Sequence, residues 1–115
     1  MDPRVSDSRI KLVKGDTGPS IQLTLTSEAT GLPIDLTGAT VTAHFKSVAT
    51  GSFVFSRALS VLAPATQGIA VIVWGATDLN QTPGDYNAEV EILFSGGVRQ
   101  TVYDLVKFRI RDQIA

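Results

Sequence analysis

The sequence contains no cysteine, and its 115 residues include only one histidine, one tryptophan and one methionine. Without cysteine the chain can form no disulfide framework, no thiolate zinc site and no cysteine nucleophile. Ten basic residues nearly balance eleven acidic ones, so no strong positive field is available to attract nucleic acid. The sequence therefore offers little material for catalysis, for a cofactor or metal site, or for nucleic-acid binding.

Long apolar runs are also missing. No stretch approaches the roughly 18 apolar residues that a membrane-spanning helix needs, and residues 1–13 lack the apolar segment of a secretory signal. We therefore expect a soluble protein made in the cytoplasm, with no membrane partner. With 43% hydrophobic and 18% charged residues, the composition is typical of one globular domain with a single core.

Apolar and polar residues alternate in several short segments, which is the pattern of half-buried β-strands. The clearest segments are 20–26, 39–47, 86–94 and 98–111, while residues 68–75 are apolar on both faces, as in an interior strand. Glycine and proline separate the segments, and no helical period is sustained. Seven or eight such strands predict an antiparallel β-sandwich, whose core should include Leu23, Leu25, Val41, Phe45, Ile72, Trp74, Tyr86, Val90, Ile92, Val102 and Phe108.

The segment VKGDTGPS, residues 13–20, has three interpretations. It contains two collagen-like triplets, a Lys-Gly-Asp tripeptide of the kind that adhesion receptors bind, and the residues of an ordinary turn. Collagen needs glycine at every third position over many turns, and a tripeptide match arises easily by chance. Because Gly15 and Gly18 allow positive φ and Pro19 can begin a strand, we interpret the segment as a turn.

Few polar residues could act as catalysts or ligands. His44 lies on the polar face of its predicted strand and has no partners at zinc-ligand spacing, so we expect it to be solvated. Glu89 and Glu91 share a face, but both should point to solvent rather than into a cleft. If residues 95–97 form a hairpin turn, Glu91 lies diagonal to Arg99, which predicts an exposed cross-strand ion pair. We therefore expect no enzymatic activity and no small-molecule substrate.

A row of basic residues lies near the C-terminus. Lys107, Arg109 and Arg111 fall on one face of the last predicted strand. Such a row can keep a sheet edge soluble, or it can dock onto an acidic neighbour. Both interpretations remain open at this point, and we treat the three residues as candidate interface residues.

Three segments together resemble a known family. They are KGDTGPSIQLTLT, LPIDLTGATVTAHFK and TPGDYNAEVEILFSGGVRQT, and they span most of residues 10–103. They resemble the immunoglobulin-like N-terminal domain of phage baseplate upper proteins and related small virion proteins of tailed phages. The resemblance implies an immunoglobulin-like sandwich over residues 9–115 and a structural role in a virion. It also implies that Tyr86 forms a tyrosine corner, whose hydroxyl bonds a backbone group a few residues upstream, near Asp78.

The resemblance implies a role in a virion, and two other roles are alternatives. We expect a non-enzymatic structural protein of a tailed-phage virion, present in several copies in the tail or baseplate and in contact with other virion proteins. A capsid decoration or head-tail junction protein is the first alternative. A carbohydrate-binding module is the second, because Trp74, Tyr86 and Tyr103 could stack on sugars.

The N-terminus is predicted to be a separate segment. Residues 1–8 are polar, contain Pro3 and Arg4, and lack the alternating pattern of a strand. We therefore expect a flexible arm that adds backbone hydrogen bonds to a neighbour during assembly. A frayed terminus without a partner is the alternative.

Overall fold

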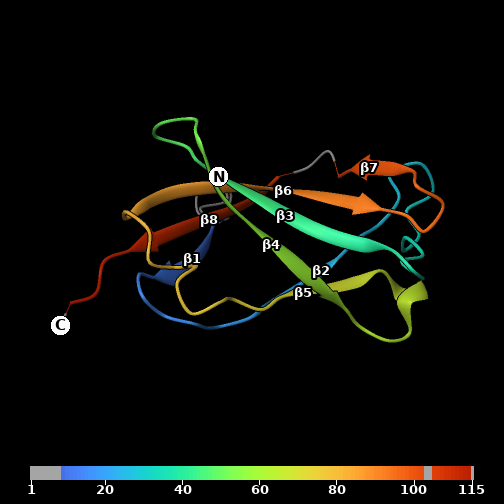
Figure 1. The fold of residues 1–115 in the computed structure, drawn as a ribbon, viewed down its shortest axis with the longest axis horizontal. Helices are drawn as coiled ribbons and strands as arrows, with labels where there is room; N and C mark the ends of the chain where they lie inside the picture. The colour runs from blue at the N-terminus through green and yellow to red at the C-terminus, as the bar shows by residue number, and fades with distance from the viewer. Residues whose placement is uncertain (1–8, 103–104, 115) are drawn as a thin grey trace, which may run out of the picture.

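The computed structural model describes residues 9–102 and 105–114, and in these residues the predicted all-β fold is confirmed. Eight strands and one short 3-10 turn follow one another in this part of the chain (Figure 1). The strands are β1 (Ile10–Val13), β2 (Ile21–Thr24), β3 (Thr40–Ser47), β4 (Phe53–Val61), β5 (Ile69–Ile72), β6 (Gly84–Leu93), β7 (Arg99–Thr101) and β8 (Val106–Arg111), and the 3-10 turn is Ala65–Gln67.

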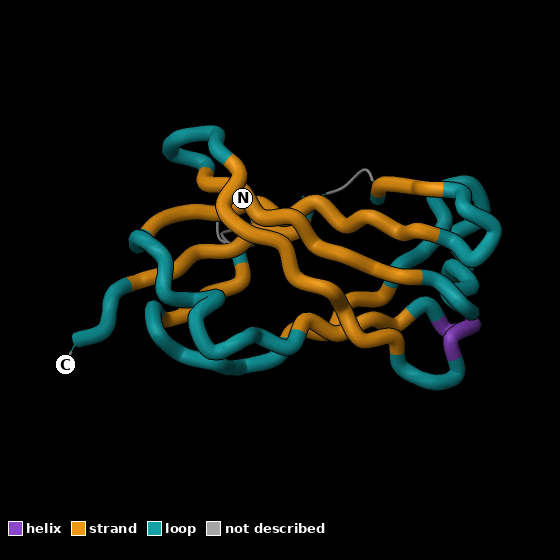
Figure 2. Tube along the Cα trace, in the orientation of Figure 1, coloured by secondary structure: helices purple, strands orange, loops and turns teal. Residues whose placement is uncertain are grey.

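The strands form one strongly curled sheet that closes over its own core. Hydrogen bonding links them in the order β1-β8-β6-β3-β4-β5-β2, and β7 pairs with β6 beside β8. Strand β4 joins the two layers, because its first part pairs with β3 and its last residues, Ser60 and Val61, pair with β5. The two layers face each other in Figure 2, with loops at both ends. This is the sandwich arrangement that the alternating segments predicted.

One detail differs from the expected antiparallel arrangement. Strand β1 pairs with β8 in parallel, with Ile10 opposite Phe108 and Leu12 opposite Ile110. The first strand therefore lies beside the last one, although the sequence separates them by almost the whole chain. Sequence alternation could not show this, because it specifies which face a strand buries and not which neighbour it pairs with.

The core lies between the two layers and is centred on aromatic rings. The ring centroid of Phe45 lies 4.4 Å from that of Phe55, 5.6 Å from that of Trp74 and 5.4 Å from that of Phe108. Nine of the eleven predicted core residues are buried. The other two, Leu23 and Val102, are only half-buried, because both lie at the open side of the sandwich described below.

Strand β4 contains a charged residue, Arg57, among its inward-facing positions. Phe55, Arg57, Leu59 and Val61 alternate with more exposed residues, so Arg57 lies on the inner face of β4. The register shift lies nearer the start of β4: Phe45 pairs with Phe55 and Lys46 with Phe53, so Val54 is the extra residue. Arg57 is accepted on the inner face because Asp78 neutralises its charge, as described in the next section.

Two predicted turns are present. Asp16 N–H donates to the carbonyl oxygen of Val13 at 3.1 Å, and Gly15 between them has a φ of 86°. Residues 13–20 thus begin with a tight turn, as predicted, although the positive φ occurs at Gly15 and not at Gly18. In the hairpin after β6, Gly97 has a φ of 91° and its N–H donates to the carbonyl oxygen of Phe94. Among the described residues, no helix is long and apolar enough to cross a membrane.

Candidate functional site

Tyr86 has the contact expected of a tyrosine corner. Its ring is buried, and its hydroxyl donates a hydrogen bond to the backbone carbonyl of Thr82, four residues upstream. Burial raises the pKa of the Tyr86 hydroxyl, which keeps the proton on the oxygen that donates. The acceptor is therefore Thr82 and not the neighbourhood of Asp78. The contact fixes the loop before β6 and leaves the hydroxyl no ligand to bind.

Asp78 instead forms an ion pair with Arg57. The guanidinium donates two hydrogen bonds of 2.7 Å to the two carboxylate oxygens, and the N–H of Gly75 donates a third at 2.8 Å. Burial alone would raise the pKa of Asp78, but these hydrogen bonds outweigh it and hold the pKa below its ordinary value. The pair ties β4 to the loop that precedes β6. Sequence reasoning missed this contact because the two residues belong to segments whose packing the pattern does not specify.

The basic row on β8 does not lie on an edge strand. Lys107, Arg109 and Arg111 are exposed on one face, as predicted. However, β8 is paired on both sides, with β6 and with β1, so the interpretation as an edge-protecting row is wrong. The side-chain nitrogen Nε of Arg109 donates to Asp85 at 2.8 Å, and Arg111 donates to the carbonyl oxygen of Asp112. The other two candidate interface residues, Pro3 and Arg4, lie outside the described residues.

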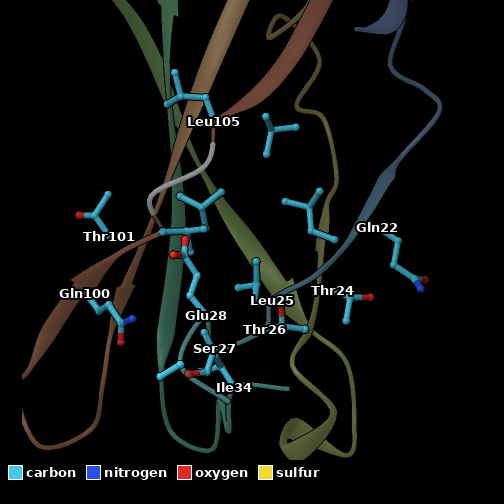
Figure 3. Close-up of a pocket in the computed structure, with 15 residues that line it drawn as sticks. Gln22, Thr24, Leu25, Thr26, Ser27, Glu28, Ile34, Gln100, Thr101 and Leu105 are labelled. Carbon is cyan, nitrogen blue, oxygen red and sulfur yellow. The ribbon is translucent and has the colours of Figure 1, made fainter. Parts of the chain in front are cut away.

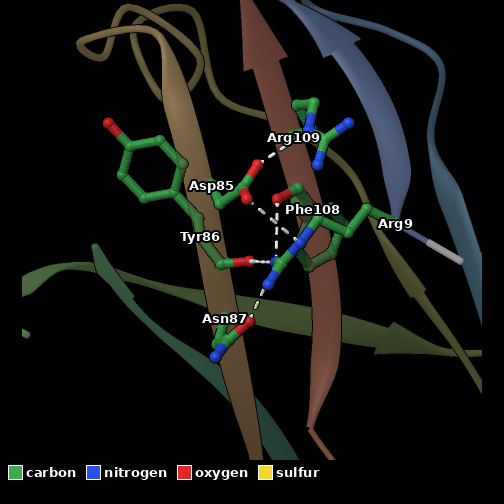
Figure 4. Close-up of polar contacts among 6 residues, drawn as sticks. All are labelled: Arg9, Asp85, Tyr86, Asn87, Phe108 and Arg109. Carbon is green, nitrogen blue, oxygen red and sulfur yellow. Dashed lines mark hydrogen bonds and ion pairs between the residues drawn. The ribbon is translucent and has the colours of Figure 1, made fainter. Parts of the chain in front are cut away.

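Asp85 connects β1 to the rest of this face (Figure 4). Its carboxylate lies 2.8 Å from Nε of Arg109 and 3.3 Å from Nε of Arg9. The hydrogen bond from Arg109 lowers the pKa of Asp85, and the charges of both arginines add to that effect. Arg9 also donates to Asn87 Oδ1 at 3.1 Å and to two backbone carbonyls. This arginine therefore fixes the start of β1 on β6 and β8.

A second polar network crosses β4, β3, β6 and β7. His44 Nδ1 lies 2.6 Å from the Ser56 hydroxyl, and His44 Nε2 lies 3.1 Å from Glu91 Oε1. The other oxygen of Glu91 lies 3.1 Å from Arg99 Nε, so the predicted cross-strand pair of Glu91 and Arg99 is confirmed. The contacts of His44 were not predicted, because they depend on the pairing of β3 with both β4 and β6.

Ser56, His44 and Glu91 are the residue types that form the catalytic triad of many hydrolases. A triad also needs the hydroxyl to face a cleft in which a substrate can be held. The shallow hollow beside His44 is lined by residues that include Phe45, Phe53 and Glu89, but Ser56 and Glu91 are not among the described residues that line it. The network therefore holds strands together on an open face. The described residues also contain no group of three His, Cys, Asp or Glu side chains that could hold a metal ion.

The larger hollow is a groove of about 600 Å³ along the open side of the sandwich. Eight consecutive residues, 22–29, line one wall, and the described residues 100–102, 105 and 106 line the other. Figure 3 shows Gln22 and Thr24 on one side of the groove, and Gln100 and Thr101 on the opposite side. The groove follows the strand direction because one wall is the edge of β2 and its continuation.

The wall formed by β2 has unpaired backbone groups. Strand β2 is the last in the sheet order, so no described strand pairs with its second edge. The N–H groups of Leu25 and Ser27 donate to carbonyl oxygens on the β5 side, those of Gly68 and Leu32. Because successive residues of a strand direct their backbone groups to opposite edges, the N–H and C=O groups of Gln22, Thr24 and Thr26 face the groove.

The floor of the groove is apolar and its rim is polar. Leu25 and Val90 at the floor are 6% and 1% exposed. The apolar lining residues are Leu23, Leu25, Ala29, Ile34, Val90, Val102, Leu105 and Val106. Glu28 is the charged residue among the described residues that line it. A strand edge beside an apolar floor is the arrangement that binds an extended peptide segment.

Comparison with known proteins yields a match of fold. No family model and no curated protein matches the sequence. Among solved structures, the chain is similar to CopC from Methylosinus trichosporium OB3b, with a TM-score of 0.51 and 11% identity, over 93% of this chain and 87% of that chain. At this identity the likeness shows the fold, an immunoglobulin-like β-sandwich, and carries no information on function.

Proposed function

We propose that this chain is a non-enzymatic structural protein that acts through contacts with other proteins, as a multi-copy component of the tail or baseplate of a tailed-phage virion. The resemblance of residues 10–103 to phage baseplate domains supports the virion assignment. The observation that carries the interaction role is the groove, because it presents unpaired backbone groups of β2 beside an apolar floor.

The other polar clusters support the same proposal. Asp78, Asp85 and Glu91 are each committed to an arginine partner, so their charges stabilise the fold and are not free to transfer protons. A capsid decoration or head-tail junction protein would use the same surfaces. Copy number in the particle distinguishes these positions.

The carbohydrate-binding alternative loses two of its three stacking residues. Trp74 is 6% exposed and its indole N–H donates to the carbonyl oxygen of Pro19 at 2.8 Å, and Tyr86 is 5% exposed. Buried rings offer no face to a sugar. The third residue, Tyr103, lies outside the described residues.

Quantitative mass spectrometry of purified phage particles tests the proposal. We expect the protein in the particle at a low multiple of the tail symmetry. A count in the hundreds would move the assignment to head decoration, and absence from the particle would refute the virion role.

A further inference from the structure

The groove has the chemistry of an acceptor for one extended strand. Its β2 wall directs N–H and C=O groups outward from Gln22, Thr24 and Thr26, and these groups need partners spaced as in a strand. Its floor is apolar, so every second side chain of the occupant should be apolar. Its charged lining residue is Glu28, so a basic residue in the occupant is favoured.

The N-terminal segment of the chain matches these requirements. Met1, Pro3 and Val5 are apolar at alternate positions, and Asp2, Arg4 and Ser6 lie between them. Three apolar residues are too few to predict a strand from sequence, but they suffice to fill one side of a short donor strand. Arg4 supplies the positive charge that Glu28 favours. Pro3 lacks an N–H, and the even-numbered residues retain theirs for bonding to β2.

The first described residues show where the N-terminal segment joins the structure relative to the groove. Ile10 lies opposite Phe108 on β8, and Val106 at the start of β8 lines the groove. The chain therefore enters the described structure at one end of the groove, on the layer that contains β8. The edge of β2 belongs to the other layer, about 10 Å away for packed sheets.

We propose that the groove of each copy binds residues 1–8 of a second copy as an added strand antiparallel to β2. This choice of a second copy rests on the proposed function, in which several copies meet in one particle. Each copy then donates one segment and accepts one, which builds a two-fold dimer when the exchange is reciprocal and rings or chains of subunits when it is not. Binding of the segment within its own chain is the alternative, and the double variant described below distinguishes it from binding to a second copy.

Engineered cysteines test this proposal cleanly, because the natural chain has none. One variant carries Ser6→Cys, and separate variants carry Gln22→Cys, Thr24→Cys or Thr26→Cys to cover alternative registers. The Ser6→Cys protein is mixed with each of the others under mild oxidation. A disulfide between the two different chains can form only between copies and only where their Cβ atoms approach within about 4.5 Å. Intact mass identifies the mixed dimer.

The matched control is Thr50→Cys, an exposed position in the turn between β3 and β4. We expect at least one groove variant to give about tenfold more mixed dimer than Thr50→Cys, because binding raises the local thiol concentration. Circular dichroism and thermal unfolding of each variant verify that it is folded. A yield equal to that of the control in all three registers would overturn the acceptor site.

The double variant with Ser6→Cys and Thr24→Cys in one chain distinguishes a segment that binds in its own groove from a segment that binds in the groove of a second copy. A monomer that loses both free thiols would show that the segment binds in its own groove, and this would overturn binding by a second copy. The result is independent of the virion assignment. Cross-linking between copies of a protein that is absent from particles would leave the acceptor site standing and refute only the proposed function.

Discussion

Asp78 is the residue whose charge the fold depends on most clearly. Only 9% of its surface is exposed, and its carboxylate accepts three hydrogen bonds, two from Arg57 and one from Gly75. Removing one partner of such a pair leaves the other charge uncompensated. Because the side chain of Arg57 is 36% exposed, water screens part of that cost.

We predict that Asp78→Asn destabilises the protein by about 2 kcal/mol at neutral pH. Urea denaturation measures this loss. Asp16→Asn is the matched control, because Asp16 is an exposed aspartate near a turn, and its effect should be close to zero. Equal losses in the two variants would contradict the role of the pair.

The same residue predicts a pH dependence. The pKa of Asp78 is lower in the folded state than its ordinary value, so the unfolded state binds the proton more tightly. The stabilisation is therefore complete above the ordinary pKa of about 3.9 and is lost as the pH falls through the folded pKa. Urea denaturation at a series of acidic pH values should show a shallower decline for Asp78→Asn than for the natural protein.

Tyr86 gives a second prediction at this scale. Tyr86→Phe removes the hydroxyl that donates to the carbonyl oxygen of Thr82 and keeps the buried ring. We expect a loss of about 1 kcal/mol in unfolding free energy, the usual net value of one hydrogen bond. Thermal and urea denaturation measure it, and an unchanged stability would show that the corner contact is dispensable.

At the scale of elements, β1 is one of the short strands that a single neighbouring strand holds. It is four residues long and pairs with β8 alone among the described strands. Arg9 at its start binds Asp85 and Asn87 across β8 (Figure 4). The side chains of β6 therefore help to hold a strand that does not pair with β6.

We predict that Asp85→Asn loosens β1 without unfolding the domain. Hydrogen exchange at the amides of Leu12 and Lys14, which face β8, should become about two- to fivefold faster, which corresponds to the ~0.5–1 kcal/mol expected for partly exposed ion pairs. Amides in the middle of β3 serve as the internal control. Uniform acceleration across all strands would mean that the change acts on global stability instead.

The connection that brings β2, β5 and residues 32–34 together depends on Gly68. Its φ is 69°, and an added Cβ would lie 2.6 Å from the carbonyl oxygen of Leu25 and 3.0 Å from that of Ile34. Gly51 has nearly the same φ of 70° but nothing within 4 Å of an added Cβ. Alanine substitutions at the two positions therefore distinguish the effect of backbone strain from the effect of crowding around the added Cβ.

We predict that Gly68→Ala costs about 2 kcal/mol more unfolding free energy than Gly51→Ala. Both variants share the strain of a left-handed backbone conformation, about 1 kcal/mol, so the difference reports the contact with backbone oxygens. Urea denaturation of the two variants measures it. Equal destabilisation would show that the loop at Gly68 can move away.

At the scale of the whole molecule, the proposed function concerns surfaces and not a reaction centre. The sheet closes over one core but leaves a groove along one side, where Leu23 and Val102 are only half-buried. The side that the fold leaves open is the side that an added strand can complete.

We predict that deleting residues 1–8 leaves the unfolding free energy nearly unchanged and abolishes incorporation into particles. The core residues that the structure describes lie between Ile10 and Ile110, so stability should not depend on the segment, whereas assembly should. Urea denaturation and mass spectrometry of particles assembled with the truncated protein measure the two effects. Normal incorporation would rule out the segment as a means of attachment and would direct attention to the exposed faces of the sheet.

The sequence by itself determined the fold class, most of the core and several local contacts. Alternation identifies the buried face of a strand, because side chains of a strand point to opposite faces in turn, and this correctly placed residues such as Val41, Phe45 and Val90. Local contacts such as the hairpin at Gly97 and the pairing of Glu91 with Arg99 follow from a turn and the register that it sets.

Only the tertiary structure decided which distant segments meet. The parallel pairing of β1 with β8, the pair of Arg57 with Asp78 and the contacts of His44 join residues on different strands or loops. The groove likewise exists because the curled sheet brings β2, at one end of the strand order, opposite β7 and the start of β8. Alternation is the same for an edge strand and an interior strand, so whether the backbone groups of β2 are paired depends on the position of every other strand.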